Sequence, residues 1–227
     1  MLGFFEGIKL IKCVIFDFDG VIADSHSMFN KLFTRIANEE LDLGITNEEF
    51  AQFPGMRFEL RLSYLAKQKG IDVSQENLDK AIAKGRNEYH ESTSSFTTLY
   101  EGAKEFLQEL RNNNIKVCLG SNGSRRTVLK MLNQFEIFDL FDSIVTYDDV
   151  THGKPAPDMF LKNADNVGVE YGECVVVGDA IEDINAAKAG GMKSIGLLTT
   201  NKKETLSVAD LIMESIANLN FELVKNL

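Results

Sequence analysis

The stretch that decides the fold is Val14-Ile15-Phe16-Asp17-Phe18-Asp19-Gly20-Val21, an apolar run that ends at two acids and a glycine. A short apolar run bounded by a turn residue is typical of a buried strand. The two acids therefore fall at the carboxyl end of that strand, where open α/β sheets bind ligands. Because neighbouring carboxylates resist ionisation unless a cation or a shared proton intervenes, we expect a metal-assisted site at Asp17 and Asp19. Taken alone, Asp and Gly after a strand also form ordinary turns.

Length and composition describe a globular chain with an acidic balance. The chain has 227 residues, of which 44% are hydrophobic and 26% are charged. This is enough for one large domain, or for one domain with an insert. The formal net charge of -10 argues against nucleic-acid binding. An anionic substrate must therefore be recruited by local cations or by a metal.

The cysteines and the amino-terminal segment favour a cytoplasmic location. Cys13, Cys118 and Cys174 each lie within an apolar run, and an odd number fits no closed disulfide framework, so we expect reduced, buried thiols. Residues 1–10 are apolar but carry charges and lead directly into the first strand, so we expect no cleaved signal. No run approaches the roughly 20 apolar residues of a membrane span, so we expect no membrane association.

Apolar runs and helical patterns alternate along most of the chain. Strands are predicted at residues 12–18, 116–120, 143–147, 174–178 and 194–198. Helical patterns follow at 103–112, 125–134, 158–167 and 184–189. This alternation predicts an α/β fold with a doubly wound parallel sheet.

The chain between the first two predicted strands is far longer than one crossover needs. Its surplus is helical in pattern, with a capping box at Thr46 and Glu49 and a helix stop at Gly70. We therefore expect an inserted all-helical cap domain at 25–91, and a core domain formed by 1–24 and 92–227. The small polar segment 92–95 is the expected hinge.

Three more polar groups follow the later strands. Ser121 and Asn122 come after the second strand, in a turn that offers a hydroxyl and backbone N–H groups to an anion. Lys154 follows the third strand in a loop stiffened by two prolines. Asp179 and Asp183 follow the fourth strand. Each group alone has an ordinary explanation, as a turn, a surface lysine and an acidic helix start.

Together the four groups resemble the motifs of the haloacid dehalogenase superfamily, in its phosphatase branch with a helical cap inserted after the first motif. The family pattern is Asp-x-Asp-Gly, then Ser or Thr, then Lys, then Gly-Asp-x-x-x-Asp. The chain matches it at 17–20, Ser121, Lys154 and 178–183. The resemblance covers nearly the whole chain and implies the Rossmann-like core of that superfamily.

The resemblance also implies roles for these residues. Asp17 is the nucleophile that forms an aspartyl-phosphate, and Asp19 is the general acid and base that serves an alcohol leaving group. Lys154 neutralises a phosphoryl oxygen and restrains the nucleophile. The implied phosphate-binding residues are Ser121, Asn122 and Gly20.

The implied cofactor is Mg²⁺, a hard cation that prefers oxygen ligands. Asp17, the Asp19 carbonyl and Asp179 are the expected ligands. Asp183 is expected to act through a metal-bound water or as a partner of the ligands.

The cap is expected to recognise the leaving group. The loop at 54–57 lies between two predicted cap helices, and we expect it to enter the site. Gly55, Arg57 and Arg61 are the candidate specificity residues, although solvated surface arginines are at least as common.

The expected function is Mg²⁺-dependent hydrolysis of a small phosphorylated metabolite, such as a sugar phosphate or a phosphoglycolate-like compound. One alternative is a sugar-phosphate mutase of the β-phosphoglucomutase type. Such relatives typically carry a histidine ten residues beyond the second motif aspartate, where this chain has Phe29 and places His26 three residues earlier. A second alternative is a non-catalytic phospho-acceptor or binding module. The sequence leaves a monomer and a homodimer open.

Overall fold

The computed structural model describes residues 10–53, 56 and 58–227. The expectation of an uncleaved amino-terminal segment at 1–10 lies almost entirely outside this range. The expectations for Gly55 and Arg57 also lie outside it. In the described residues, no helix combines the length and the apolarity needed to cross a membrane.

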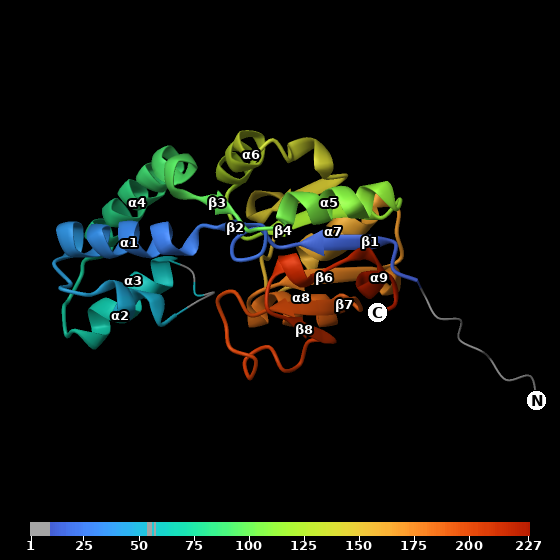
Figure 1. Ribbon diagram of the computed structural model, residues 1–227. Coiled ribbons are helices and arrows are strands. Elements are labelled where there is room, and N and C mark those ends of the chain that lie inside the picture. The colour runs from blue at the N-terminus through green and yellow to red at the C-terminus, as the bar shows by residue number, and fades with distance from the viewer. Residues whose placement is uncertain (1–9, 54–55, 57) are drawn as a thin grey trace, which may run out of the picture.

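The core is built on one parallel sheet with the strand order β5-β4-β1-β6-β7-β8 (Figure 1). The order reverses at β1, so the carboxyl end of that strand is the topological switch point of the sheet. The predicted α/β class is therefore confirmed. The strands are β1 (Cys13–Phe16), β4 (Lys116–Ser121), β5 (Ser143–Thr146), β6 (Cys174–Gly178), β7 (Lys193–Leu197) and β8 (Leu211–Met213).

Strand β8 is absent from the sequence prediction. It has three residues, all half-buried, and pairs only with β7 at the edge of the sheet. A strand this short carries too little apolar pattern to be separated from a loop.

Both faces of the sheet are covered, because successive side chains of a strand point to opposite sides. Val14 and Phe16 pack with α5 (Ala103–Asn112), α6 (Arg125–Gln134) and α9 (Phe221–Lys225). Cys13 and Ile15 pack with α7 (Asp158–Val167) and α8 (Ile181–Ala189) on the other face. The expected reduced thiols are confirmed, since Cys13, Cys118 and Cys174 are free and buried. Short 3₁₀ helices occupy Phe138–Leu140, Tyr147–Asp149, Tyr171–Glu173 and Ile216–Asn218.

The inserted segment forms a helical lobe beside the core (Figure 1). It has its own apolar cluster, which includes Phe33, Ile36, Phe50 and Leu62. The predicted capping box is present, with the Thr46 hydroxyl accepting from the Glu49 N–H. The helices of the lobe are α1 (His26–Leu41), α2 (Asn47–Ala51), α3 (Phe58–Gln68) and α4 (Gln75–Phe96).

The predicted hinge at 92–95 is wrong, because this segment belongs to α4. Helix α4 is supported near this end by α6, where Lys130 Nζ donates to the His90 carbonyl at 2.7 Å. Tertiary packing thus extends the helix through a polar segment of low helix propensity. The chain passes between lobe and core at β2 (Ala23–Asp24) and β3 (Thr98–Leu99), which pair antiparallel. The domain limits 1–24, 25–91 and 92–227 stay a prediction.

Candidate active site

The loops after β1, β4, β6 and β7, together with Lys154, surround a cavity of about 130 Å³ at the carboxyl edge of the sheet. Among the described residues, five carboxylates and one ammonium group line it. This imbalance of charge favours either a bound cation or protonation of some of the carboxylates. The lining residues are Asp17, Asp19, Asn122, Lys154, Asp179, Ala180, Glu182, Asp183, Thr200 and Asn201.

The Lys154 ammonium group joins two of these carboxylates. Its Nζ lies 2.7 Å from Asp17 Oδ1 and 2.6 Å from Asp183 Oδ1, and only 4% of the lysine side chain is exposed. Burial raises the pKa of Asp17 to about 7, although the nearby lysine opposes the shift. Burial alone disfavours the ammonium form of Lys154, but the carboxylates of Asp17 and Asp183 outweigh it and raise the pKa of the lysine. The ion pair therefore holds Lys154 charged.

Asn122 fixes the backbone of Lys154. Its Oδ1 accepts from the Lys154 N–H at 3.0 Å, and its Nδ2 donates to the Lys154 carbonyl at 3.3 Å. A Cβ atom on Gly153 would lie 2.5 Å from Asn122 Oδ1, so a glycine is needed beside this contact. The Asn122 side chain thus holds the Lys154 backbone in place. The phosphate contact implied for Asn122 through the backbone of its turn stays a prediction.

Gly20 shapes the turn after β1. Its N–H donates to the Ala23 carbonyl at 2.9 Å, so this donor is engaged within the turn. The phosphate contact that the resemblance implies for Gly20 stays a prediction. Its φ is +82°, and a Cβ atom here would lie 2.2 Å from Asp179 Oδ2. Only a residue without a side chain lets the turn after β1 approach Asp179 this closely.

Asp19 and Ser121 lie near the cavity in different environments. Asp19 lines the cavity and accepts a short hydrogen bond on Oδ1 from the hydroxyl of Ser25, a buried residue at the start of α1 that sequence reasoning missed. Ser121 is fully buried, and its Oγ accepts from the Gly123 N–H at 3.0 Å. The hydroxyl proton of Ser121 remains available to donate, so its phosphate contact stays a prediction.

Three buried carboxylates have the spacing of a cation site. Asp17, Asp179 and Asp183 each offer an oxygen, and these oxygens lie within 4.8 Å of one another. Burial, followed by the charges of Asp183 and Asp17, raises the pKa of Asp179 well above its usual range. An all-oxygen, charge-rich set fits a hard divalent cation such as Mg²⁺. The side chain of Asp19 is not part of this set, so only its carbonyl remains as the expected ligand.

Sequence reasoning also missed the loop after β7. Thr200 donates a short hydrogen bond to Asp179 Oδ2, and Asn201 Nδ2 donates to the Asp179 carbonyl at 3.0 Å. Thr199 Oγ1 donates to the Gly20 carbonyl at 2.5 Å. The sequence did contain a clue to this loop, because its residues follow a predicted strand and so lie at the same edge of the sheet as the other polar groups.

Arg61 is buried, so the alternative expectation of a solvated surface arginine is wrong, and its role in substrate specificity stays a prediction. It is 4% exposed, and its guanidinium group donates to the carbonyls of Phe50, Phe53 and Met56. The guanidinium carbon also lies 4.6 Å from the centre of the Phe50 ring. Burial lowers the pKa of Arg61 to about 10. The residue thus connects α3 with the end of α2 and with Phe53 and Met56.

Comparisons with known proteins agree on one family. A family model described as "Haloacid dehalogenase-like hydrolase" matches residues 14–197. The chain is 30% identical to a β-phosphoglucomutase of Bacillus subtilis over 94% of both chains. It is 27% identical to a pyrophosphatase, PpaX, of Bacillus velezensis over 93% of this chain and 95% of that one. A crystal structure of a hydrolase from Deinococcus radiodurans, with bound phosphate and sodium, matches 96% of this chain and 97% of that chain with a TM-score of 0.77 at 27% identity.

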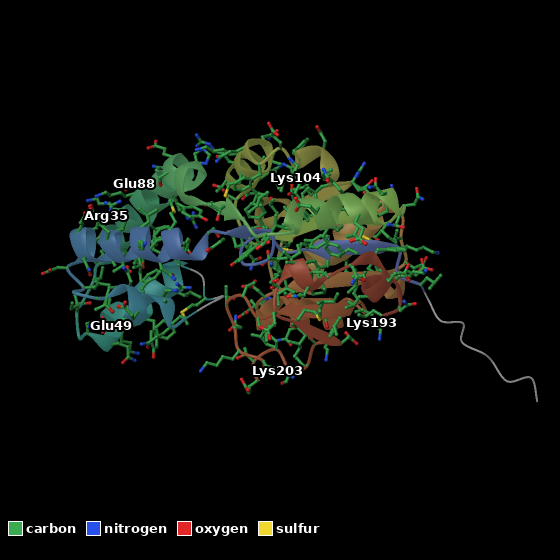
Figure 2. All side chains as sticks on the ribbon, viewed as in Figure 1. Arg35, Glu49, Glu88, Lys104, Lys193 and Lys203 are labelled. Atoms are coloured by element: carbon green, nitrogen blue, oxygen red, sulfur yellow. The ribbon has the colours of Figure 1, made fainter. Side chains whose placement is uncertain are left out.

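Replacing Arg61 by Met should destabilise the protein, because three carbonyl groups lose a charged donor. Hydrogen bonds to charged groups contribute about 1.5–3 kcal/mol each, so we expect a loss of at least about 2 kcal/mol in the free energy of unfolding, measured by urea denaturation. Arg35→Met is the matched control. Arg35 lies on the surface of the helical lobe beside Glu88 (Figure 2), and exposed ion pairs contribute about 0–1 kcal/mol. An Arg61→Met protein of unchanged stability but raised KM would instead show that Arg61 contributes to substrate binding.

Replacing Gly20 by Ala should weaken cation binding, because the new Cβ atom would displace Asp179. Disturbing a ligand in this way is expected to cost about 10- to 100-fold in affinity for Mg²⁺, measured by calorimetry. Gly44→Ala is the control, since Gly44 also has positive φ but a Cβ atom there would meet nothing within 4 Å. Equal effects of the two substitutions would show that backbone strain alone matters at Gly20.

Mg²⁺ should stabilise the protein more at pH 8 than at pH 6. The pKa of Asp17 lies at about 7 in the fold, above its ordinary value of 3.8. Ionisation of Asp17 therefore costs the metal-free protein stability as the pH rises through this interval, and below pH 7 protons compete with the cation. Thermal unfolding with Mg²⁺ and with a chelator, at both pH values, measures the effect. A shift in Tm that is equal at both values, or larger at pH 6, would contradict this account.

Proposed function

Because the chain belongs to the haloacid dehalogenase-like hydrolase family, we propose that it is a Mg²⁺-dependent phosphatase that acts on a small phosphomonoester. The observation that carries the proposal is the buried contact of Lys154 with Asp17 beside the carboxylates of Asp179 and Asp183. This arrangement places a carboxylate nucleophile, a fixed positive charge and a set of cation ligands in one small cavity.

Asp17 is the proposed nucleophile. Its Oδ1 accepts from the Phe18 N–H at 2.7 Å and contacts Lys154, so Oδ2 is the oxygen directed to the substrate. In the first step a bond forms between Asp17 and phosphorus, and the ester P–O bond breaks. In the second step water attacks phosphorus, the aspartyl-phosphate bond breaks, and inorganic phosphate leaves.

Asp19 is the proposed proton carrier for both steps. It donates a proton to the departing alkoxide and then takes one from the attacking water. The Ser25 hydroxyl donates to Asp19 Oδ1, so the other carboxylate oxygen, Oδ2, is the one that exchanges the proton. Since Ser25 lies at the start of α1, the position of this acid depends on the connection to the cap.

Mg²⁺ would be held by Asp17 and Asp179, with Asp183 close by, and would supply positive charge against the phosphoryl oxygens. The similar structure from Deinococcus radiodurans holds phosphate and sodium, which supports the proposal that this fold binds an anion and a cation. Lys154 adds the protein's own positive charge. As charge spreads over the transferred phosphoryl group, this fixed ammonium group stabilises it.

A sugar-phosphate mutase is the second candidate, because a β-phosphoglucomutase is among the similar proteins. The position at which mutase relatives typically carry histidine is Phe29. Its ring packs 4.3 Å from that of Phe33 and 5.4 Å from that of Tyr89, measured between ring centres. An apolar ring within an aromatic cluster offers no proton to a sugar hydroxyl, which favours hydrolysis. The cytoplasmic location and a monomeric or homodimeric state stay predictions.

The proposal is tested by incubating the protein with sugar monophosphates, phosphoglycolate and pyrophosphate, with Mg²⁺ or with a chelator. We expect phosphate release from at least one monoester only with Mg²⁺. Asp17→Asn should lower that rate by at least about 10³-fold, since removal of a nucleophile has effects of this order. Asp79→Asn, on the surface of α4, is the matched control and should be as active as the wild type. Phosphate release that survives Asp17→Asn contradicts the mechanism, and isomer formation without phosphate release establishes the mutase.

A further inference from the structure

The loop directly after β7 contacts both acidic turns of the site. Thr199 donates to the Gly20 carbonyl in the turn after β1, and Thr200 donates to the carboxylate of Asp179 in the turn after β6. Asn201 donates to the main-chain carbonyl of Asp179 and, at 3.2 Å, to Thr200 Oγ1. The loop lies at the edge of the core that faces the helical lobe (Figure 1).

This convergence follows from the sheet. Strand β7 pairs in parallel with β6, and Gly178 lies opposite Gly196. The residues just beyond the two strands therefore emerge side by side. Thr199 reaches one strand further, to the turn that follows β1, which is the other neighbour of β6. One short segment thus fixes the distance between the two turns that carry the proposed cation ligands.

The hydrogen bonds from Thr200 and Asn201 to Asp179 are suited to a metal ligand that must keep its negative charge. Asp179 is 2% exposed, and a carboxylate in such a place needs hydrogen-bond donors. A lysine or arginine at position 200 would neutralise the carboxylate and compete with a metal ion. The Thr200 hydroxyl instead fixes the rotation of the carboxylate through Oδ2 and adds no charge. Asn201 fixes the backbone of the same residue.

We infer that Thr200 is a positioning residue for the cation site, and that it acts by orienting Asp179 toward Mg²⁺ with the support of Asn201. This inference rests on the proposed function, because it presupposes that Asp179 is a metal ligand. Partners that orient metal ligands typically contribute about 10- to 100-fold to metal affinity.

Thr200→Val removes the hydroxyl and keeps the shape of the side chain. Calorimetric titration of the chelator-treated, full-length protein with Mg²⁺ should show about 10- to 100-fold weaker binding, and Thr200→Ser should restore most of the affinity. The Mg²⁺ concentration for half-maximal phosphate release should rise in parallel. At saturating Mg²⁺, kcat should stay within about threefold of the wild type, since the lost contact acts on cation binding and not on the chemical step.

Thr34→Val is the matched control. Thr34 is a buried threonine in α1, and its Oγ1 has no hydrogen-bond partner among the described residues. We expect its substitution to leave Mg²⁺ binding unchanged. Thermal unfolding of all variants in the presence of a chelator reports whether the fold itself is affected.

The outcomes separate this inference from the proposed function. If the wild type binds Mg²⁺ and Thr200→Val binds it equally well, the inference is overturned and the proposed function stands. If Thr200→Val and Thr200→Ser are equally weakened, the hydroxyl is not what matters, and the inference is overturned too. A wild type that binds no Mg²⁺ overturns both.

Discussion

One buried ammonium group holds the candidate site together. Lys154 contacts Asp17 from the turn after β1 and Asp183 from α8, so it joins segments that are far apart in the sequence. Removing one partner of a buried ion pair leaves an uncompensated charge, which destabilises the fold. The contacts that hold Lys154 in place therefore also matter for the stability of the site. Asn122 fixes its backbone, and the absence of a side chain at Gly178 leaves room for Asp183, whose Cβ would otherwise lie 2.2 Å from a new Cβ atom.

Lys154 balances only part of the negative charge of the site. Among the described residues that line the cavity, it supplies one ammonium group against five carboxylates. Burial keeps the pKa of Asp17 and Asp179 raised even with Lys154 present. An added cation would offset the excess negative charge of such a site. A neutral hydroxyl such as that of Thr200 orients a carboxylate and leaves its negative charge available to the cation. The excess of negative charge and the neutral hydrogen bonds to the carboxylates therefore both favour the binding of a cation.

The sequence predicted the parts of the site that follow from topology. Acids and a lysine placed after successive buried strands must meet at one edge of a parallel sheet, so the proximity of Asp17, Lys154 and Asp179 could be expected before their contacts were known. The partners of individual polar groups could not be expected in this way. The amide of Asn122 and the guanidinium of Arg61 are engaged by backbone groups, and such contacts depend on loop conformations that no periodicity encodes.

Two further differences between prediction and structure have local causes. The polar segment 92–95 resembles a linker in composition, yet contacts near the end of α4, such as that between His90 and Thr127 of α6, accompany its helical conformation. The residues after β7 went unassigned because two threonines and an asparagine are common in turns. Their role depends on the groups they contact, Gly20 and Asp179, which the strand order of the sheet brings next to this loop.

The short ladder between β2 and β3 constrains how the helical lobe can move. Both chain crossings pass through it, with Ala23 opposite Leu99 and Asp24 opposite Thr98, and the Tyr100 N–H extends the pairing to the Ile22 carbonyl at 3.0 Å. Two separate connections would let the lobe twist and slide relative to the core, and two connections bonded to each other restrict these motions. Ser25 directly follows Asp24 of the ladder, and its hydroxyl donates to Asp19. The side chain of the proposed acid is therefore anchored at the place where the two connections are joined.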